Sequence, residues 1–276
     1  MNSPREIAQN YTATGVAKAT LPIFKMLLLG VLAGMFIAFA GLGQTVASTA
    51  WIGSFARFVG AAMFPVGFIM VLLAGSELFT DNCLMIISVM EKETKLRAML
   101  KSWLFVYIGN FIGAILVANL AVLSGIGSSF DNAVGVAMIN AATARTSLGF
   151  MEAVYSGILC GFLVCIAVWM SFATKYLIGK FVAMFLPVML FALAGFEHSI
   201  ANVYYITAGL AASRNPVYLA MAGRSNISTL TWSNMFTANL IPVTIGNIIG
   251  GMVIVGLGYW LIYLRSAEKK VPATKK

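Results

Sequence analysis

Six long apolar runs dominate the pattern of hydrophobic and polar positions along the chain. Each is long enough to cross the roughly 30 Å hydrocarbon core of a bilayer as a helix. They cover residues 26–48, 58–90, 103–125, 150–172, 181–212 and 237–264, to within a few positions. The second and fifth runs are too long for one plain helix, and polar residues interrupt them in GSELFTDN at 75–82 and GFEHSIAN at 195–202. The pattern predicts an all-α polytopic membrane protein with six spans, the second and fifth broken.

The two halves of the chain also resemble each other. The interrupted segments share Gly75 with Gly195, Glu77 with Glu197, and Asn82 with Asn202. YIGNFIGAILVANL at 107–120 likewise matches TIGNIIGGMVIVGL at 244–257. Each repeat, at about 26–125 and about 150–264, holds three spans, and this odd number makes the two repeats inverted. Inverted repeats with corresponding broken helices are typical of transporters and channels. We therefore expect one channel domain over 1–276, with both broken segments lining its pathway.

Composition and charge support this class. Hydrophobic residues make up 60% of the chain and charged residues 10%, against roughly 25% charged in a soluble domain. With both termini in the cytoplasm, the basic residues on the outside are only Arg57, Arg145, Arg214 and Arg224, of 18 in all. This asymmetry follows the positive-inside rule, so the net charge of +9 orients the chain in a lipid bilayer and predicts no nucleic-acid partner. Residues 1–25 are expected to form an amphipathic helix on the inner surface or a plain tether, and 265–276 a cytoplasmic tail.

Several polar residues in or near the broken segments are expected to stabilise the conformation of these segments. The carboxylates of Glu77 and Glu197 are predicted to accept hydrogen bonds from freed backbone N–H groups, with direct proton handling as the alternative for Glu197. Asn82 is assigned a structural role, and Asn110 and Asn247 are expected to bond the broken backbones. The Gly109–Gly113 and Gly246–Gly250 pairs have the G-x-x-x-G spacing that lets helices approach closely.

His198 is the only histidine of the chain, and it stands in an otherwise apolar run. Leu78 occupies the equivalent place in the other repeat, so a requirement common to both segments does not explain the imidazole. Because histidine titrates near neutral pH, His198 is a candidate for the transport site; a buried core histidine is the alternative. Thr80 is interpreted either as a substrate contact or as a partner of the backbone.

With GSELFT, GFEHSIAN and NLIPVTIGNIIGG (239–251) in view, the chain resembles the formate/nitrite transporter family, which includes hydrosulfide channels. The resemblance spans nearly the whole chain. It implies an aquaporin-like protomer with its own pore, assembled as a homopentamer in the inner membrane of a prokaryote. It also implies passage of small monovalent anions of weak acids, with formate first and nitrite or hydrosulfide as alternatives.

The resemblance assigns residues to the pathway. The family's central histidine falls on His198, its neighbouring glutamate on Glu197 and its loop threonine on Thr80. The constriction residues fall on Phe64, Phe68 and Phe191, and the broken segments add Leu78, Phe79 and Asn202 to the expected pathway. Family members commonly carry a lysine where this chain has Arg145. Arginine keeps its proton more firmly, so a mechanism needing only a positive field is retained at this position.

These residues suggest a mechanism and its rivals. A bare anion would be excluded by an apolar constriction, whereas a neutral acid would escape most of that penalty. His198 is therefore expected to share a proton with the anion, with passive anion conduction as the alternative. An aquaporin-like channel for neutral solutes is a rival that would not need a titratable histidine. The chain carries no HExxH or nucleophile-elbow motif, so no enzyme activity is expected, and neither is a cofactor or metal.

Overall fold

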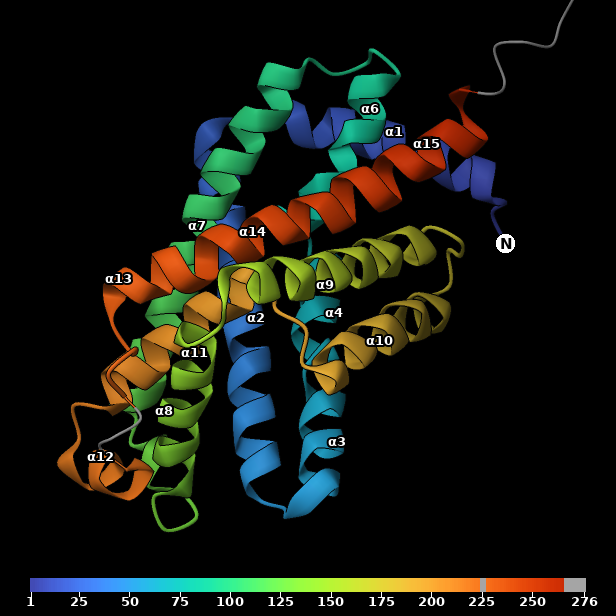
Figure 1. The fold of residues 1–276 in the computed structure, drawn as a ribbon. Helices are drawn as coiled ribbons and strands as arrows, with labels where there is room; N and C mark the ends of the chain where they lie inside the picture. The colour runs from blue at the N-terminus through green and yellow to red at the C-terminus, as the bar shows by residue number, and fades with distance from the viewer. Residues whose placement is uncertain (224–226, 266–276) are drawn as a thin grey trace, which may run out of the picture.

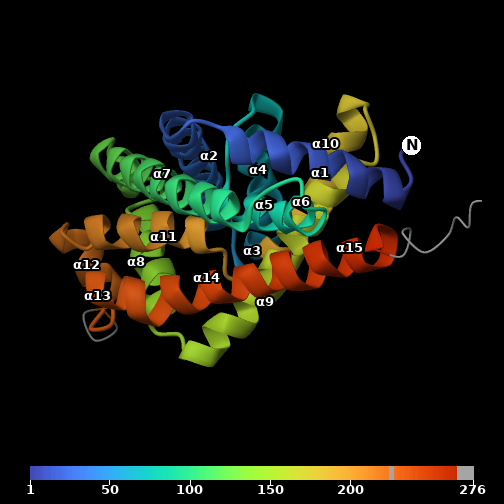
Figure 2. The ribbon, with the colours of Figure 1, turned by 90° about the horizontal axis from the view of Figure 1, so that it is seen from above.

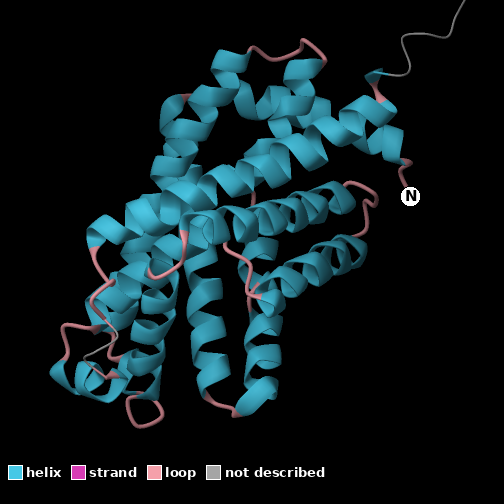
Figure 3. Ribbon diagram, viewed as in Figure 1, coloured by secondary structure: helices cyan, strands magenta, loops and turns pink. Residues whose placement is uncertain are grey.

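The protein is a bundle built around six membrane-length helices. The computed structural model describes residues 1–223 and 227–265, and within these ranges no residue forms a strand (Figure 3). The helices long and apolar enough to span a membrane are Ile23–Thr49, Gly53–Ala74, Leu96–Leu123, Phe150–Ser171, Leu177–Ala194 and Trp232–Tyr263. Six spans, as predicted from the apolar runs, are therefore confirmed.

The first half of the chain contains α1 (Pro4–Thr20), α2 (Ile23–Thr49), α3 (Gly53–Met63), α4 (Pro65–Ala74), α5 (Phe79–Asn82), η1 (Cys83–Met85), α6 (Ile86–Met90) and α7 (Leu96–Leu123). After η2 (Ile126–Ser128), the second half contains α8 (Ala133–Thr146), α9 (Phe150–Ser171), α10 (Leu177–Ala194), α11 (Ser199–Ala212) and α12 (Pro216–Ala222). It ends with α13 (Trp232–Asn234), η4 (Met235–Leu240), α14 (Ile241–Ile248), η5 (Ile249–Leu257) and α15 (Gly258–Tyr263).

The second and fifth spans are broken where the sequence indicated, but the breaks are shorter than expected. Gly75 and Gly195 end α4 and α10 with φ values of +78° and +79°, a conformation that L side chains rarely adopt. The chain then restarts a helix at Phe79 and at Ser199. Only residues 75–78 and 195–198 are therefore non-helical, and the expectation of loops through 82 and 202 is wrong for their second halves. A four-residue break leaves few backbone groups to satisfy at membrane depth.

Each repeat is preceded by a shorter helix that the apolar runs did not predict as part of the repeat. These helices are α1 and α8, and Figure 1 shows α1 with α6 near the top and α8 with α12 at the bottom. Seen from above, α2 and α7 lie on one side and α9 and α14 on the other, with α5 between them (Figure 2). The two repeats thus surround the two breaks from opposite sides.

The N-terminal helix packs on protein and is not a tether. A capping box formed by Ser3 and Glu6 starts α1, and the helix ends at Thr20, short of the expected residue 25. Ile7 and Tyr11 are buried, with Tyr11 fully inaccessible. Of the expected tail at 265–276, all but the first residue lies outside the described residues.

Glycines set the closest helix contacts in both repeats. A Cβ on Gly113 of α7 would overlap the carbonyl oxygen of Val31 in α2, and one on Gly250 would overlap that of Ile158 in α9. The G-x-x-x-G pairs noted in the sequence therefore let α7 pack on α2 and α14–η5 pack on α9. This packing holds the scaffold on which the broken helices rest.

Candidate functional site

His198 lies at the meeting point of the two broken helices. It is the N-cap residue of α11, and its Nδ1 accepts the backbone N–H of Ala201 at 3.1 Å. Its Nε2 lies 3.0 Å from Oγ1 of Thr80, in the first turn of α5. The imidazole is 2% exposed. One side-chain hydrogen bond therefore joins the N-terminal ends of the two half-helices, α5 and α11.

The hydrogen bonds of the ring define its tautomer. Because Nδ1 accepts a backbone N–H, it carries a lone pair, and in the neutral ring the proton must then be on Nε2. Nε2–H donates to Thr80 Oγ1, which leaves the threonine O–H free to donate onward. An imidazolium would carry a proton on Nδ1, where Ala201 now donates, so charging the ring would break the cap. The neutral ring therefore leaves the Thr80 hydroxyl as a free donor where the two breaks meet.

Aromatic rings enclose the histidine on one side. The rings of Phe64 and Phe191 meet edge-on with centroids 5.2 Å apart, and Phe191 stacks on His198 at 6.1 Å. Phe64, Phe191, His198 and Arg145 line a cavity of about 50 Å³. Because a cavity needs about 10–15 Å³ of such volume to hold one water molecule, this cavity has room for a very small solute. An apolar constriction thus adjoins a polar chamber.

Three other residues expected in the pathway do not line this cavity, and their place in the pathway stays a prediction. Phe68 and Leu78 are fully buried, and neither lines this cavity. The ring of Phe79 packs edge-on against Trp103 and Tyr107, with centroids 5.6 and 4.9 Å away. Phe79 therefore supports the break from behind, because successive residues of a helix start point in different directions.

Arg145, Glu197 and Asn202 form what we call the α8 cluster. Arg145 Nε donates to Asn202 Oδ1 at 3.0 Å and lies 3.8 Å from Glu197 Oε2, while Nη1 donates to the Ala141 carbonyl at 2.9 Å. The guanidinium carbon sits 3.9 Å above the centre of the Tyr205 ring. Among the described residues no group accepts a hydrogen bond from Nη2. The arginine is therefore fixed in position, with donors still free beside the cavity.

Lys18, Glu77 and Asn82 form the equivalent α1 cluster in the other repeat. Lys18 Nζ lies 3.0 Å from Glu77 Oε2 and donates to Asn82 Oδ1 at 2.8 Å. Asn82 Nδ2 donates to Glu77 at 2.9 Å, as Asn202 Nδ2 donates to Glu197 at 2.6 Å. A cavity of about 290 Å³, lined by Lys18 and Glu77, opens here. Each break thus has its own cation, carboxylate and amide.

The two glutamates do not bind the freed backbone N–H groups, contrary to expectation, because the asparagines of α7 and α14 do. Asn110 accepts the Phe79 N–H at 2.9 Å and donates to the carbonyls of Glu77 and Gly30 at 2.9 and 2.8 Å. Asn247 makes the equivalent bonds to the N–H of Ser199 and the carbonyls of Glu197 and Gly157, at 2.9, 3.0 and 2.8 Å. This arrangement leaves both carboxylates for the cations.

Sequence reasoning missed several of these groups. Lys18 was missed because it precedes the first span and so lies outside the first repeat. Asn239 was missed because it lies before the matched 244–257 segment. Asn239 accepts from Asn202 at 2.7 Å and donates to the Arg145 carbonyl at 3.1 Å. A basic residue ahead of each repeat was the available signal for Lys18. Within the described residues, no three His, Cys, Asp or Glu side chains are placed to hold a metal ion.

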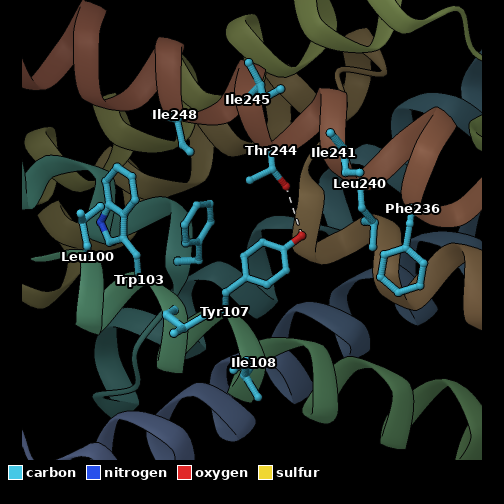
Figure 4. Close-up of a pocket in the computed structure, with 12 residues that line it drawn as sticks. Leu100, Trp103, Tyr107, Ile108, Phe236, Leu240, Ile241, Thr244, Ile245 and Ile248 are labelled. Carbon is cyan, nitrogen blue, oxygen red and sulfur yellow. Dashed lines mark hydrogen bonds between the residues drawn. The ribbon is translucent and has the colours of Figure 1, made fainter.

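A further, apolar cavity lies away from this chemistry. It is a groove of about 530 Å³ between α7 and the η4–α14 helix, lined almost entirely by apolar side chains. Figure 4 shows its polar contact, the 3.1 Å hydrogen bond between Tyr107 and Thr244. Both walls are membrane spans, so the groove opens toward lipid or a neighbouring protein. We do not assign it to the pathway, because His198 and Arg145 do not line it.

Similarity to known proteins identifies the family of this chain. The family model for formate/nitrite transporters matches residues 5–261. The formate channel FocA of Escherichia coli (strain K12) is 39% identical over 96% of this chain and 95% of its own length. A probable formate transporter of Methanothermobacter thermautotrophicus is 34% identical over 95% of this chain and 97% of its own.

Solved structures agree. A pentameric formate channel with formate bound superposes with a TM-score of 0.79 at 31% identity, covering 88% of this chain and 98% of the other. An ion channel of the FNT family gives 0.81 at 25% identity, covering 93% and 98%. The family match over nearly the whole chain agrees with the paired breaks and the histidine between them, and so the chain belongs to the formate/nitrite transporter family.

Proposed function

We propose that the protein is a formate channel of a prokaryotic inner membrane, assembled as a homopentamer in which each protomer has its own pore. The named relatives and the pentameric formate-bound neighbour support the substrate and the assembly. The observation that carries the proposal is the hydrogen bond between His198 and Thr80, which places the free hydroxyl donor of Thr80 at the meeting point of the broken helices.

The neighbouring residues fit passage of a small anion. The positive field of Arg145 and its free Nη2 donors attract the anion to the chamber beside Phe191. The N-terminal ends of α5 and α11 add their partial positive charge. The hydroxyl of Thr80, which accepts from the Nε2–H of His198, then donates to the anion and replaces part of the water that the anion leaves behind. The constriction of Phe64 and Phe191 excludes larger or more strongly hydrated solutes.

We infer that both termini face the cytoplasm. The N-terminus lies beside the 172–176 loop, because Asn2 bonds to Phe172 and Ala173. The 91–95 loop lies at the same end, where Glu91 accepts from Trp260 of α15. Lys92, Lys95 and Lys175 gather there, and basic residues favour the inner side.

Nitrite and hydrosulfide are the alternative substrates within the family, since both are small and singly charged. A neutral-solute channel is not favoured, because Arg145 and Lys18 place a cation beside each break. The relatives are named as channels or transporters, and we propose no enzyme activity.

Uptake by proteoliposomes tests the proposal. We expect rapid entry of formate compared with protein-free vesicles, and no acceleration of urea entry. Thr80→Val removes the hydroxyl at similar size and should slow formate entry by about tenfold, since one unmade hydrogen bond to a charged group costs about 1.5–3 kcal/mol. Thr237→Val, on an exposed face, is the matched control and should leave entry unchanged. Faster entry of nitrite or hydrosulfide than of formate would reassign the substrate, and urea entry without anion entry would refute the channel class proposed.

A further inference from the structure

Asp81 is a buried carboxyl group that the pathway described above does not use. It directly follows Thr80 in α5 and is 1% exposed. Neither of its carboxyl oxygens has a hydrogen-bond partner among the described residues. The only other aspartate of the chain, Asp131, lies exposed in the loop before α8.

The internal repeat shows that the fold does not require this carboxyl group. The breaks align residue by residue, with Glu77 on Glu197 and Asn82 on Asn202. The same alignment places Ala201 opposite Asp81. A half-helix at this position therefore forms equally with a methyl group, as α11 does.

The donors that pack around Asp81 from other elements are committed elsewhere. Tyr11 donates to the Asp81 backbone carbonyl at 2.9 Å, and Lys18 is bound to the carboxylate of Glu77 and the amide of Asn82. The thiols of Cys165 in α9 and Cys83 in η1 lie 3.3 and 3.7 Å from the carbonyls of Thr80 and Phe79. Tyr11, Lys18, Glu77, Cys83 and Cys165 are the titratable groups that face this carboxyl from the elements packed around it.

A buried carboxylate without a partner is strongly unfavourable, so the group must bind a proton or acquire a partner. It also stands one residue from the hydroxyl that bonds to His198. An ionised Asp81 would repel an anion at that hydroxyl through an interior where charges are weakly screened. A neutral Asp81 would not. His198 cannot take over this titration without losing its cap to Ala201.

We propose that Asp81 is a proton-binding site coupled to anion passage, so that the anion reaches Thr80 and His198 only while the Asp81 carboxyl group is neutral. The proposal deepens the proposed function and rests on it. The coupling is reciprocal, because an anion at Thr80 must favour the protonated form of Asp81 as strongly as protonation favours the anion. Its sign is fixed: anion flux falls as pH rises through the titration of Asp81.

Infrared difference spectroscopy reads the protonation of Asp81 without any transport. Spectra of the reconstituted protein at acid and alkaline pH should contain a carboxylic-acid C=O stretch that is absent from Asp81→Asn. Asp131→Asn, the matched control, should keep the band. Asp81→Ala, which copies the equivalent residue of the other repeat, replaces Asp81→Asn if the amide variant does not assemble.

The pH dependence of formate uptake measures the coupling between protonation of Asp81 and anion flux. Over a pH range in which formate itself stays ionised, the flux of the parent should fall by about tenfold or more as Asp81 loses its proton. Asp81→Asn mimics the neutral acid and should hold the acid-side flux at every pH, whereas Asp81→Glu should restore the pH dependence. Asp131→Asn should follow the parent.

The outcomes separate this proposal from the proposed function. If the parent carries no formate, but its carboxyl band is missing from the Asp81→Asn variant, formate is refuted as the substrate and the proton site is upheld. A parent that carries formate with the same pH profile as Asp81→Asn overturns the coupling. A protein without a pH-dependent carboxyl band from Asp81 overturns the proton site itself.

Discussion

His198 performs two tasks with one ring. Nδ1 caps α11, and Nε2 donates to Thr80, so the ring both builds the half-helix and presents a donor at its end. A protonated imidazolium would abandon the first task. The proton sharing expected of this residue stays a prediction; the geometry describes a neutral ring that forms hydrogen bonds, and the titration that we propose lies at Asp81.

Arg145 tests whether field or geometry attracts the anion. Arg145→Lys keeps the charge but loses the planar fork that bonds Asn202 and lies over Tyr205, and we expect formate flux to stay within about threefold of the parent, because steering depends on charge. Arg145→Glu should lower the flux by at least about tenfold for the same reason. Arg214→Glu makes the same charge change at an exposed position after α11 and serves as the control. Equally poor flux in Arg145→Lys and Arg145→Glu would show that the fork matters, and parent-like flux in both would remove Arg145 from the pathway.

Residues could be predicted from sequence only where they stood out from a pattern. His198 stood out because the equivalent position in the other repeat is occupied by Leu78. Lys18 did not stand out, because a lysine at this position also fits a polar face of an amphipathic helix on the membrane surface. Asp81 did not stand out within GSELFTDN, where any polar residue fits a loop. The structure places it in the half-helix that starts at Phe79, where it is buried.

At the scale of elements, each half-helix is held by a neighbouring full-length helix. Asn110 of α7 and Asn247 of α14 bond a carbonyl within their break and the first N–H of the half-helix that follows it. Glycines bring these helices close to α2 and α9. The sequence predicted the breaks and the close contacts, since both leave local signals. It could not predict the four-residue length of each break, because the restart of the helix depends on bonds from residues about 30 to 50 positions away.

Gly250→Ala should weaken the second of these scaffolds. The added methyl group would overlap the Ile158 carbonyl, and overpacking of this kind costs about 1–3 kcal/mol. We expect a lower apparent melting temperature of the oligomer in detergent, followed by size-exclusion chromatography after heating. Gly258→Ala is the matched control, since a Cβ there meets no atom within 4 Å. It should be neutral or slightly stabilising, because alanine favours helix over glycine by up to about 1 kcal/mol. Equal melting of both variants and the parent would contradict the packing role of Gly250.

At the scale of the whole molecule, two inverted repeats place a cation cluster at each break and join the breaks through one hydrogen bond. The six spans and the inversion followed from run lengths and an odd span count, both of which are properties of the sequence. The helix α8 could not be predicted in this way, because its residues are only moderately apolar and it is shorter than a span. Its position at the opposite end from α1 makes the repeat more complete than the apolar runs suggest (Figure 1).

The central claim is that permeation runs past the hydrogen-bonded pair of His198 and Thr80, and paired measurement of formate uptake and internal pH in vesicles carrying His198 variants tests it most directly. His198→Phe keeps an aromatic ring but removes both nitrogens, so we expect formate entry to fall by at least about tenfold, the cost of one lost charge-assisted hydrogen bond. His198→Asn retains both a capping oxygen and an N–H donor, and should keep measurable entry with the pH profile and proton uptake of the parent. Parent-like formate entry through folded His198→Phe would contradict the pathway, and loss of proton uptake in His198→Asn alone would return the titration to the histidine.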